Sequence, residues 1–188
     1  NPFGLPTTLV WNNITDAWET GHFLRLYANS LFVTIVAVLG IVFFCGAAGY
    51  AFAHFEFKGS RLLFLYFLAG MMIPPQVILL PAFKIMSTLG LVNTYLGLIL
   101  VYTIITLPLS VWMLTSYFRA IPVELEEAAI IDGASRLGIL FRITLPLSLP
   151  GLVAIIVYAF VTTWNEFIFA LVLAQDYRVK TLPIAQGP

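Results

Sequence analysis

Residues 26–55 read LYANSLFVTIVAVLGIVFFCGAAGYAFAHF, a run of 30 uncharged residues between Arg25 and Glu56. The hydrocarbon core of a bilayer is about 30 Å thick, and an α-helix needs about 20 apolar residues to cross it. A strand of a membrane β-barrel would be shorter and would alternate apolar with polar residues, which this run does not do. The stretch therefore predicts a membrane-spanning helix.

The same pattern recurs three times further along the chain. Uncharged runs of 22, 34 and 23 residues lie between Arg61 and Lys84, between Lys84 and Arg119, and between Arg142 and Glu166. Backbone groups that cross lipid must bond within their own segment, which favours helices over open strands. The chain is therefore predicted to be an all-α, polytopic transmembrane helical bundle with four visible spans, over residues 29–53, 62–82, 95–118 and 149–173.

The composition agrees with a membrane protein. Of the 188 residues, 61% are hydrophobic and only 10% are charged, whereas soluble domains carry about 25% charged residues. A soluble fold of this length could not bury so much apolar surface in one core. The formal net charge of zero gives no indication of a nucleic-acid partner. The single Cys45 excludes an internal disulfide framework, and with His22 and His54 isolated in sequence no metal site is predicted.

Two local features refine the predicted spans. Cys45, Gly49 and Ala53 recur every four residues, which places small side chains on one face and predicts close approach by another helix. Pro74 and Pro75 lack backbone donors and should break or kink the second span. Such a break at membrane depth is tolerated against protein or against a water-filled cavity. Of the two, we expect a kink buried between helices.

The loops between the spans alternate between two sides of the bilayer. Residues 1–28, 81–94 and 174–188 fall on side one, and residues 54–61 and 119–148 fall on side two. Side two carries five Lys and Arg residues and side one carries four. This small excess favours a cytoplasmic side two, but charge counting alone leaves the orientation open.

A short helix is predicted in the long side-two loop. It should begin at Pro122, where the missing amide donor costs nothing, and end before Gly133, which readily adopts the left-handed conformation. Acidic side chains suit the first turn because of the helix dipole, and those present are Glu124, Glu126 and Glu127. One face is small and mostly apolar, with Leu125, Ala128, Ala129 and Asp132. Residues 134–141 could form a second short helix, and the pair is either a solvated connector or a docking element for a cytoplasmic partner.

The spacing within this loop matches a known signature. Glu127-Ala128-Ala129 is followed by three residues, Gly133, nine residues, and then Ile143-Thr144-Leu145-Pro146. This arrangement resembles the EAA signature of ATP-binding-cassette importer permeases, without a gap or substitution at its defining positions. Other segments resemble the maltose-type carbohydrate uptake branch, and together the similarity covers residues 29–183: Tyr50-Ala51-Phe52-Ala53, Phe57-Lys58-Gly59, Ile73-Pro74-Pro75-Gln76, Asn93-Thr94-Tyr95, Trp164-Asn165-Glu166-Phe167 and Thr181-Leu182-Pro183.

The resemblance implies an orientation and a set of partners. Side two would be cytoplasmic, and the loop 119–148 would couple the permease to a separate cytoplasmic ATPase subunit. A second permease subunit, identical or different, and an external solute-binding protein would complete an importer in the prokaryotic cell (inner) membrane. The residues implied to dock on the ATPase are Glu127, Ala128, Ala129, Asp132 and Gly133.

The resemblance also divides the chain and assigns its chemistry. Residues 29–173 would be the transmembrane permease domain, with residues 1–28 and 174–188 as external segments. Family members normally have an earlier first helix and a later last one, so we expect this chain to be a fragment. The sequence has no GxxxxGK[ST] loop, so we expect no enzyme activity and no cofactor on this chain, with ATP bound by the partner subunit.

The solute path is predicted from polar residues within the spans. Glu166 is the only acid in a predicted span, and an ionisable group at membrane depth is a candidate functional residue. Trp164 and Asn165 lie beside it in the sequence, and Gln76 follows the proline pair. An aromatic face and amide groups suit a hydroxylated ring. These four residues are therefore candidates for the substrate path, and their alternative role is bonding between helices.

Several rival functions remain open. The preferred one is a permease subunit of a binding-protein-dependent, ATP-driven importer that translocates a sugar or oligosaccharide. The same class of importer could instead carry a polyol, a glycerol phosphate or an amino acid. A membrane anchor or pigment-binding subunit is a candidate of another class, but it needs ligand histidines in the spans, and only His54 lies near one. A secondary transporter would show paired intramembrane charges or an internal repeat.

Overall fold

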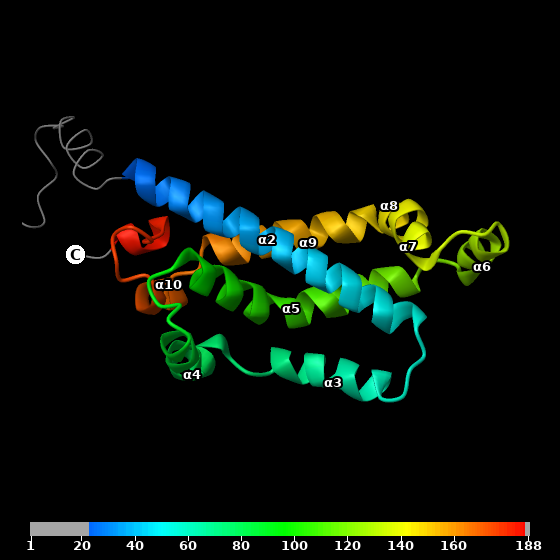
Figure 1. Ribbon diagram of the computed structural model, residues 1–188, viewed down its shortest axis with the longest axis horizontal. Coiled ribbons are helices and arrows are strands. Elements are labelled where there is room, and N and C mark those ends of the chain that lie inside the picture. The colour runs from blue at the N-terminus through cyan, green and yellow to red at the C-terminus, as the bar shows by residue number, and fades with distance from the viewer. Residues whose placement is uncertain (1–22, 187–188) are drawn as a thin grey trace, which may run out of the picture.

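The computed structural model describes residues 23–186, and over that range every regular element is a helix (Figure 1), which confirms the all-α prediction. His22 and most of the predicted segment 1–28 lie outside the described residues. The elements are α2 (Phe23–His54), α3 (Ser60–Met71), α4 (Pro75–Thr88), α5 (Tyr95–Arg119), α6 (Val123–Ile131), α7 (Arg136–Ile139), the π-helix η1 (Leu140–Thr144), α8 (Leu145–Leu147), α9 (Leu149–Trp164), α10 (Ile168–Leu173) and the 3₁₀ helix η2 (Leu182–Gln186).

Three helices form the centre of the bundle. α2 packs against α5, and α9 lies against both of them (Figure 1). α2 and α5 are each long and apolar enough to cross a bilayer, in agreement with the spans predicted over 29–53 and 95–118. Their buried apolar residues form two clusters, one around Val33 and Leu98 and one around Ile41 and Leu114. The first cluster also packs α10, and the second packs α9.

The small face predicted on α2 allows the close approach of α5. Cys45 is fully buried, and a methyl group placed on Gly49 would lie 3.3 Å from the backbone nitrogen of Thr115. A separation this short is tighter than ordinary packing, so a side chain at position 49 would push the two helices apart. The spacing of small residues therefore sets the distance between α2 and α5.

The second predicted span is a sharply broken pair of helices. α3 and α4 are bent by 103° at their junction, within the span predicted over residues 62–82, where the proline pair was expected to break or kink the helix. The break at the proline pair is confirmed, because Pro74 precedes α4 and Pro75 occupies its first position, where a missing N–H costs nothing. The expectation of a kink buried between helices is wrong for the described residues, since Pro74 and Pro75 are both exposed.

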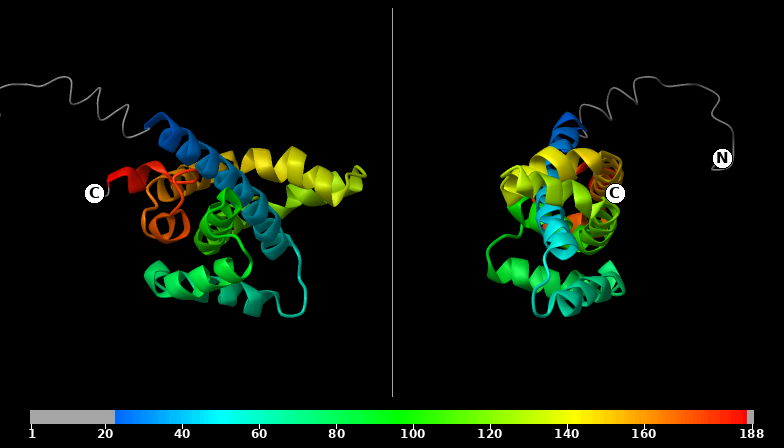
Figure 2. Two further views of the ribbon diagram at one scale, coloured as in Figure 1. Left: turned by 60° about the vertical axis from the view of Figure 1, so that its left-hand side comes forward. Right: turned by 90° about the vertical axis from the view of Figure 1, so that its right-hand side faces the viewer.

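α3 lies to one side of the central bundle (Figure 2). None of its residues is buried among the described part of the chain. Its exposed side chains are large and apolar, as at Leu62 and Tyr66, which are 73% and 77% exposed. The helix therefore presents apolar surface around most of its circumference.

The fourth predicted span is also interrupted. α9 ends at Trp164, and α10 begins at Ile168, so the continuous helix predicted over residues 149–173 is wrong. Local polar side chains explain the break: the Glu166 carboxylate accepts hydrogen bonds from the N–H groups of Phe169 and Ala170, at 3.0 Å each. Asn165 donates to the carbonyl of Val161 at 2.8 Å. Side chains that bond the nearby backbone in this way compete with a continuous helix.

The two ends of the bundle are built differently. At one end, residues 178–182 are tied to the starts of α2 and α5: Asn29 donates to the carbonyls of Arg178 and Lys180. Tyr95 donates to Asn29 and to the Arg178 carbonyl. At the other end lie the end of α2, the start of α3, the end of α5, and the segment from α6 to α8 (Figure 1). The end with α6 carries the predicted docking residues.

Candidate functional site

The predicted helix after Pro122 is confirmed. α6 begins at Val123, with Pro122 as its N-cap, and ends at Ile131. Gly133 has a φ of +80° and its N–H bonds the carbonyl of Ile130, while Ala134 bonds the carbonyl of Ala129. This left-handed glycine turns the chain back into α7, where the Ser135 hydroxyl accepts a hydrogen bond from the Gly138 N–H. We refer to residues 122–139 as the α6–α7 hairpin.

The α6–α7 hairpin projects from the end of the bundle (Figure 1). A nine-residue helix is too short to be stable alone, and α6 leaves apolar side chains uncovered, with Val123 59% and Ile131 85% exposed. The predicted docking residues are exposed on it, apart from a half-buried Ala129: Glu127, Ala128, Asp132 and Gly133. The arrangement offers a small, partly apolar surface with acidic groups to a partner outside the membrane.

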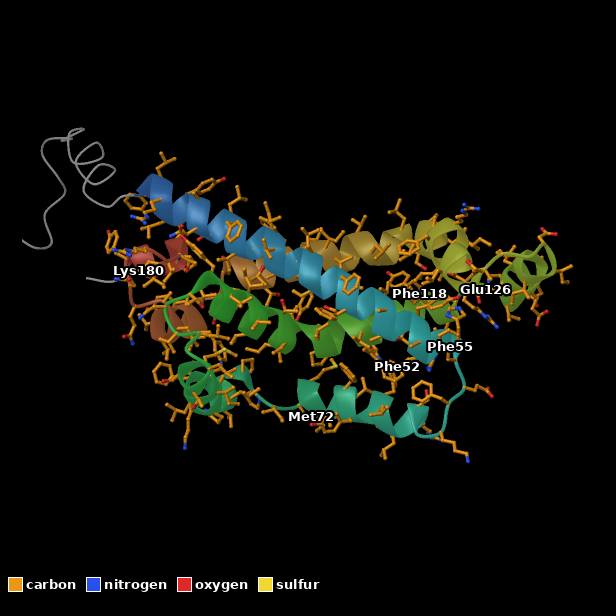
Figure 3. All side chains as sticks on the ribbon, in the orientation of Figure 1. Phe52, Phe55, Met72, Phe118, Glu126 and Lys180 are labelled. Atoms are coloured by element: carbon orange, nitrogen blue, oxygen red, sulfur yellow. The ribbon has the colours of Figure 1, made fainter. Side chains whose placement is uncertain are left out.

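One acid of α6 is turned inward and bonds two other elements. Glu126 is 3% exposed, and its Oε1 lies 2.8 Å from Nε2 of His54 at the end of α2. The hydroxyl of Thr144, at the end of η1, donates to the same oxygen at 3.2 Å. The other ring nitrogen of His54 lies 3.2 Å from the carbonyl of Tyr50. A single carboxylate therefore joins α2, α6 and η1. Figure 3 labels Glu126 at this end of the bundle.

This contact was missed by sequence reasoning. Glu126 was grouped with the exposed acids of the first turn, and His54 was treated as isolated. The two residues are far apart in the chain, and no local pattern reports their meeting. The sequence offered one signal: His54 directly follows a predicted span, on the same side of the bilayer as the loop that contains Glu126.

A large cavity opens at the same end. It has a volume of about 960 Å³ and lies between α3, the ends of α2 and α5, and the α6–α7 hairpin. Arg119 crosses its wall, donating to the carbonyl of Phe52 at 3.0 Å and placing its guanidinium over the ring of Phe64. The lining holds arginine and glutamate side chains in similar number, so it offers no uniform charge to a ligand.

A second, smaller cavity lies where the two helix breaks meet. We name it the helix-break cavity; its volume is about 180 Å³, and its polar lining consists of Gln76, Tyr102, Thr106, Thr162, Thr163 and Glu166. Two of the four predicted path residues, Gln76 and Glu166, are therefore brought together. Trp164 and Asn165 do not line this cavity, since the Trp164 ring packs on Phe160 and Tyr27 and Asn165 bonds the backbone of α9.

Tyr102 is the residue of this cavity that sequence reasoning missed. Its side chain is 3% exposed, and its hydroxyl lies near the Glu166 carboxylate without making a hydrogen bond of good geometry to any of residues 23–186. A buried hydroxyl without a partner costs about 1–3 kcal/mol. The only sequence signal was its position near the middle of an otherwise apolar run. Within the same residues no three His, Cys, Asp or Glu side chains gather as a metal site would require.

Comparison with known proteins places the chain in a family. Residues 46–185 match the model of the binding-protein-dependent transport system inner membrane component. The chain is 39% identical over 181 residues to a probable ABC transporter permease protein, YurM, of Bacillus subtilis, which covers 96% of this chain and 60% of that protein. It is 43% identical over 166 residues to the trehalose/maltose transport system permease protein MalG of Thermococcus litoralis, covering 88% of this chain and 59% of that protein.

A solved structure has the same fold. It is a chain in the crystal structure of a bacterial ABC transporter involved in the import of the acidic polysaccharide alginate, with a TM-score of 0.78 and 27% identity. The match covers 86% of this chain and 56% of that one. The chain thus spans about 60% of the length of the two curated relatives described above. With the family model matched over most of its residues, the chain belongs to the family of binding-protein-dependent transport system inner membrane components.

Proposed function

We propose that the chain is part of a permease subunit in a binding-protein-dependent, ATP-driven importer that carries a sugar or oligosaccharide. The observation that carries this proposal is the exposed α6–α7 hairpin, which presents the EAA-type residues Glu127 to Gly133 outside the membrane-spanning helices. Relatives named as permeases for trehalose/maltose, diacetylchitobiose and arabinooligosaccharides support the sugar assignment. The chain itself would conduct the solute, and ATP would be hydrolysed on a separate subunit.

The partners follow from the surfaces that the chain leaves uncovered. The small face of α6 suits a cleft on a cytoplasmic ATPase subunit, because Ala128 and Ala129 allow a partner surface to come close. The exposed apolar side chains of α2, α3 and α5 suit lipid or a second permease subunit. An external binding protein would deliver the solute at the opposite end. We place the protein in the prokaryotic inner membrane as a multi-pass subunit.

A pigment-binding role has little support from the described residues. The only histidine among residues 23–186 is His54, and its ring faces the Glu126 carboxylate and the Tyr50 carbonyl. Both ring nitrogens thus lie within hydrogen-bonding distance of protein oxygens, and neither points into open space. The uptake function is therefore the one to test first.

Uptake should depend on the assembled importer. The full-length subunit would be reconstituted in vesicles with its ATPase subunit, its second permease subunit and its binding protein. We expect ATP-dependent accumulation of a sugar from a panel of trehalose, maltose, diacetylchitobiose, glycerol phosphate and amino acids, and no accumulation without ATP. Uptake of only the last two compounds would contradict the sugar assignment. Failure of the subunit to assemble with the ATPase would contradict the importer assignment itself.

The orientation can be checked independently by thiol labelling. Single cysteines would replace Lys58, Ser135 and Thr88, which are all exposed, in a full-length background with Cys45→Ala. In intact cells, an impermeant reagent should label position 88 strongly, and positions 58 and 135 only after the membrane is opened. Positions 58 and 135 lie in two different loops, between α2 and α3 and between α6 and α7, at the same end of the bundle. They should therefore behave alike. Strong labelling of position 135 with protection of position 88 would reverse the proposed orientation.

A further inference from the structure

The two helix breaks meet at one cavity. Gln76 lies at the start of α4, just after the break from α3, and Glu166 lies in the break between α9 and α10, and both line the helix-break cavity. α4 and α10 lie next to each other (Figure 1). Interrupted helices at membrane depth are tolerated where they are covered by protein or line a cavity, and such breaks often form solute sites.

Tyr102 gives this cavity a buried hydroxyl that lies near the Glu166 carboxylate but makes no hydrogen bond of good geometry. The hydroxyl is buried, lines the cavity, and lacks a hydrogen-bond partner among the described residues. Buried polar groups in proteins are almost always bonded to protein, water or ligand. The cavity volume of about 180 Å³ corresponds to about six waters at ~30 Å³ each. That space is comparable to a small hydroxylated ring.

We propose that the helix-break cavity binds an uncharged, polyhydroxylated solute, one sugar ring at a time, with the Tyr102 hydroxyl as its buried hydrogen-bonding group. The proposal rests on the importer function proposed above and specifies the class of solute. Apolar side chains line the cavity beside the polar ones, namely Pro75, Ile105, Ile168 and Phe169. A sugar ring presents both kinds of surface, because its C–H faces are apolar and its edges carry hydroxyl groups.

The charges around the cavity disfavour an anionic solute. Among the residues that the structure describes, no Lys, Arg or His lines it, and Glu166 is its only acid. A phosphate or carboxylate group would therefore meet a like charge and no cation, which disfavours glycerol phosphate, amino acids and acidic sugars. The Glu166 carboxylate is held by the N–H groups of Phe169 and Ala170. Those two bonds offset part of its charge and fix it as an acceptor for solute hydroxyl groups.

The test uses the assembled importer and three probes that share one ring and differ in charge. A cysteine at position 76, in a Cys45→Ala background, would be labelled by a small thiol reagent with glucose, glucosamine or glucuronate present. We expect glucose to slow labelling most. In the additional variant Tyr102→Phe, the glucose concentration for half-protection should rise about 3- to 10-fold, as expected for one lost hydrogen bond. Tyr158→Phe is the matched control, because Tyr158 does not line the cavity.

A stability measurement separates binding from packing. If Tyr102 serves the solute, Tyr102→Phe removes an unpaired buried hydroxyl, so the melting temperature of the solute-free complex should stay equal or rise. A clear fall in melting temperature with unchanged protection would make Tyr102 a packing residue and overturn the proposal. Three further results would also overturn the proposal: glucuronate protecting as well as glucose, glucosamine protecting better than glucose, or no probe protecting at all. If wild-type uptake of a sugar is observed alongside any of these results, the importer function stands and only this inference fails.

Discussion

Replacing Gly133 with valine should abolish solute uptake while leaving the subunit in the membrane. Gly133 has a φ of +80°, and a side chain in this left-handed conformation costs about 1 kcal/mol or more. The backbone would relax out of that conformation and redirect α7 relative to α6. Because the site lies outside the predicted spans, insertion should be normal. Co-purification of the ATPase subunit and ATP-dependent uptake would be measured on the same preparation.

The chain provides matched controls for this variant. A methyl group at Gly133 would meet no atom within 4 Å, and the same holds for Gly46 in α2, which has no positive φ. Gly133→Ala should therefore weaken uptake, whereas Gly46→Ala should leave it near normal, because an added methyl group has space at both positions and of the two only Gly133 has a positive φ. Gly133→Asn should recover part of the activity, since asparagine tolerates the left-handed region. Wild-type uptake by Gly133→Val would show that the hairpin is merely a connector.

Replacing Glu126 with alanine should both destabilise the protein and disconnect the α6–α7 hairpin. The change leaves the His54 ring and the Thr144 hydroxyl without their shared acceptor. Removing one partner of a buried, hydrogen-bonded pair costs about 2 kcal/mol or more. We expect a lower melting temperature for the complex and a loss of ATPase stimulation by the loaded binding protein.

The control for Glu126 lies on the same helix. Glu124 is exposed, so Glu124→Ala removes the same charge from the same helix end without breaking a buried contact. It should leave stability and stimulation close to wild type. His54→Ala should reproduce the Glu126→Ala result from the side of α2. Equal behaviour of Glu124→Ala and Glu126→Ala would show that only the charge near the helix start matters, and not the three-way contact.

Sequence patterns predicted those parts of the fold that depend on interactions between residues close together in the chain. α2 and α5 follow directly from long uncharged runs, and α6 follows from a proline start, acids in the first turn and the glycine at position 133. The helix break at Pro74 was predicted for the same reason. Its 103° angle was not, because the direction of the chain after a break depends on packing against α5 and α10.

The candidate site shows where such reasoning fails. The break at Glu166 comes from a carboxylate that bonds the backbone three and four residues ahead, and an uncharged run on either side conceals that competition. The pairing of His54 with Glu126 depends on the folded chain bringing two distant segments together. Gln76 and Glu166 were selected as polar residues in apolar spans, and both line the helix-break cavity. Trp164 was selected by its proximity to Glu166 in sequence, but the end of α9 turns it toward Tyr27 and Phe160.

The exposed position of α3 has a thermodynamic consequence. Among the described residues α3 has no buried side chain, and only a few, such as Phe64 and Phe67, pack partly against the bundle. Lipid or a second subunit would therefore supply much of its stabilisation. Its order is then linked to the concentration of whatever covers it, by mass action. In detergent, the melting of the isolated subunit should shift with dilution and with added lipid, whereas the melting of α2 and α5 should not. Part of the stability of this protein thus comes from packing within the chain, and part comes from contacts with lipid or a partner subunit.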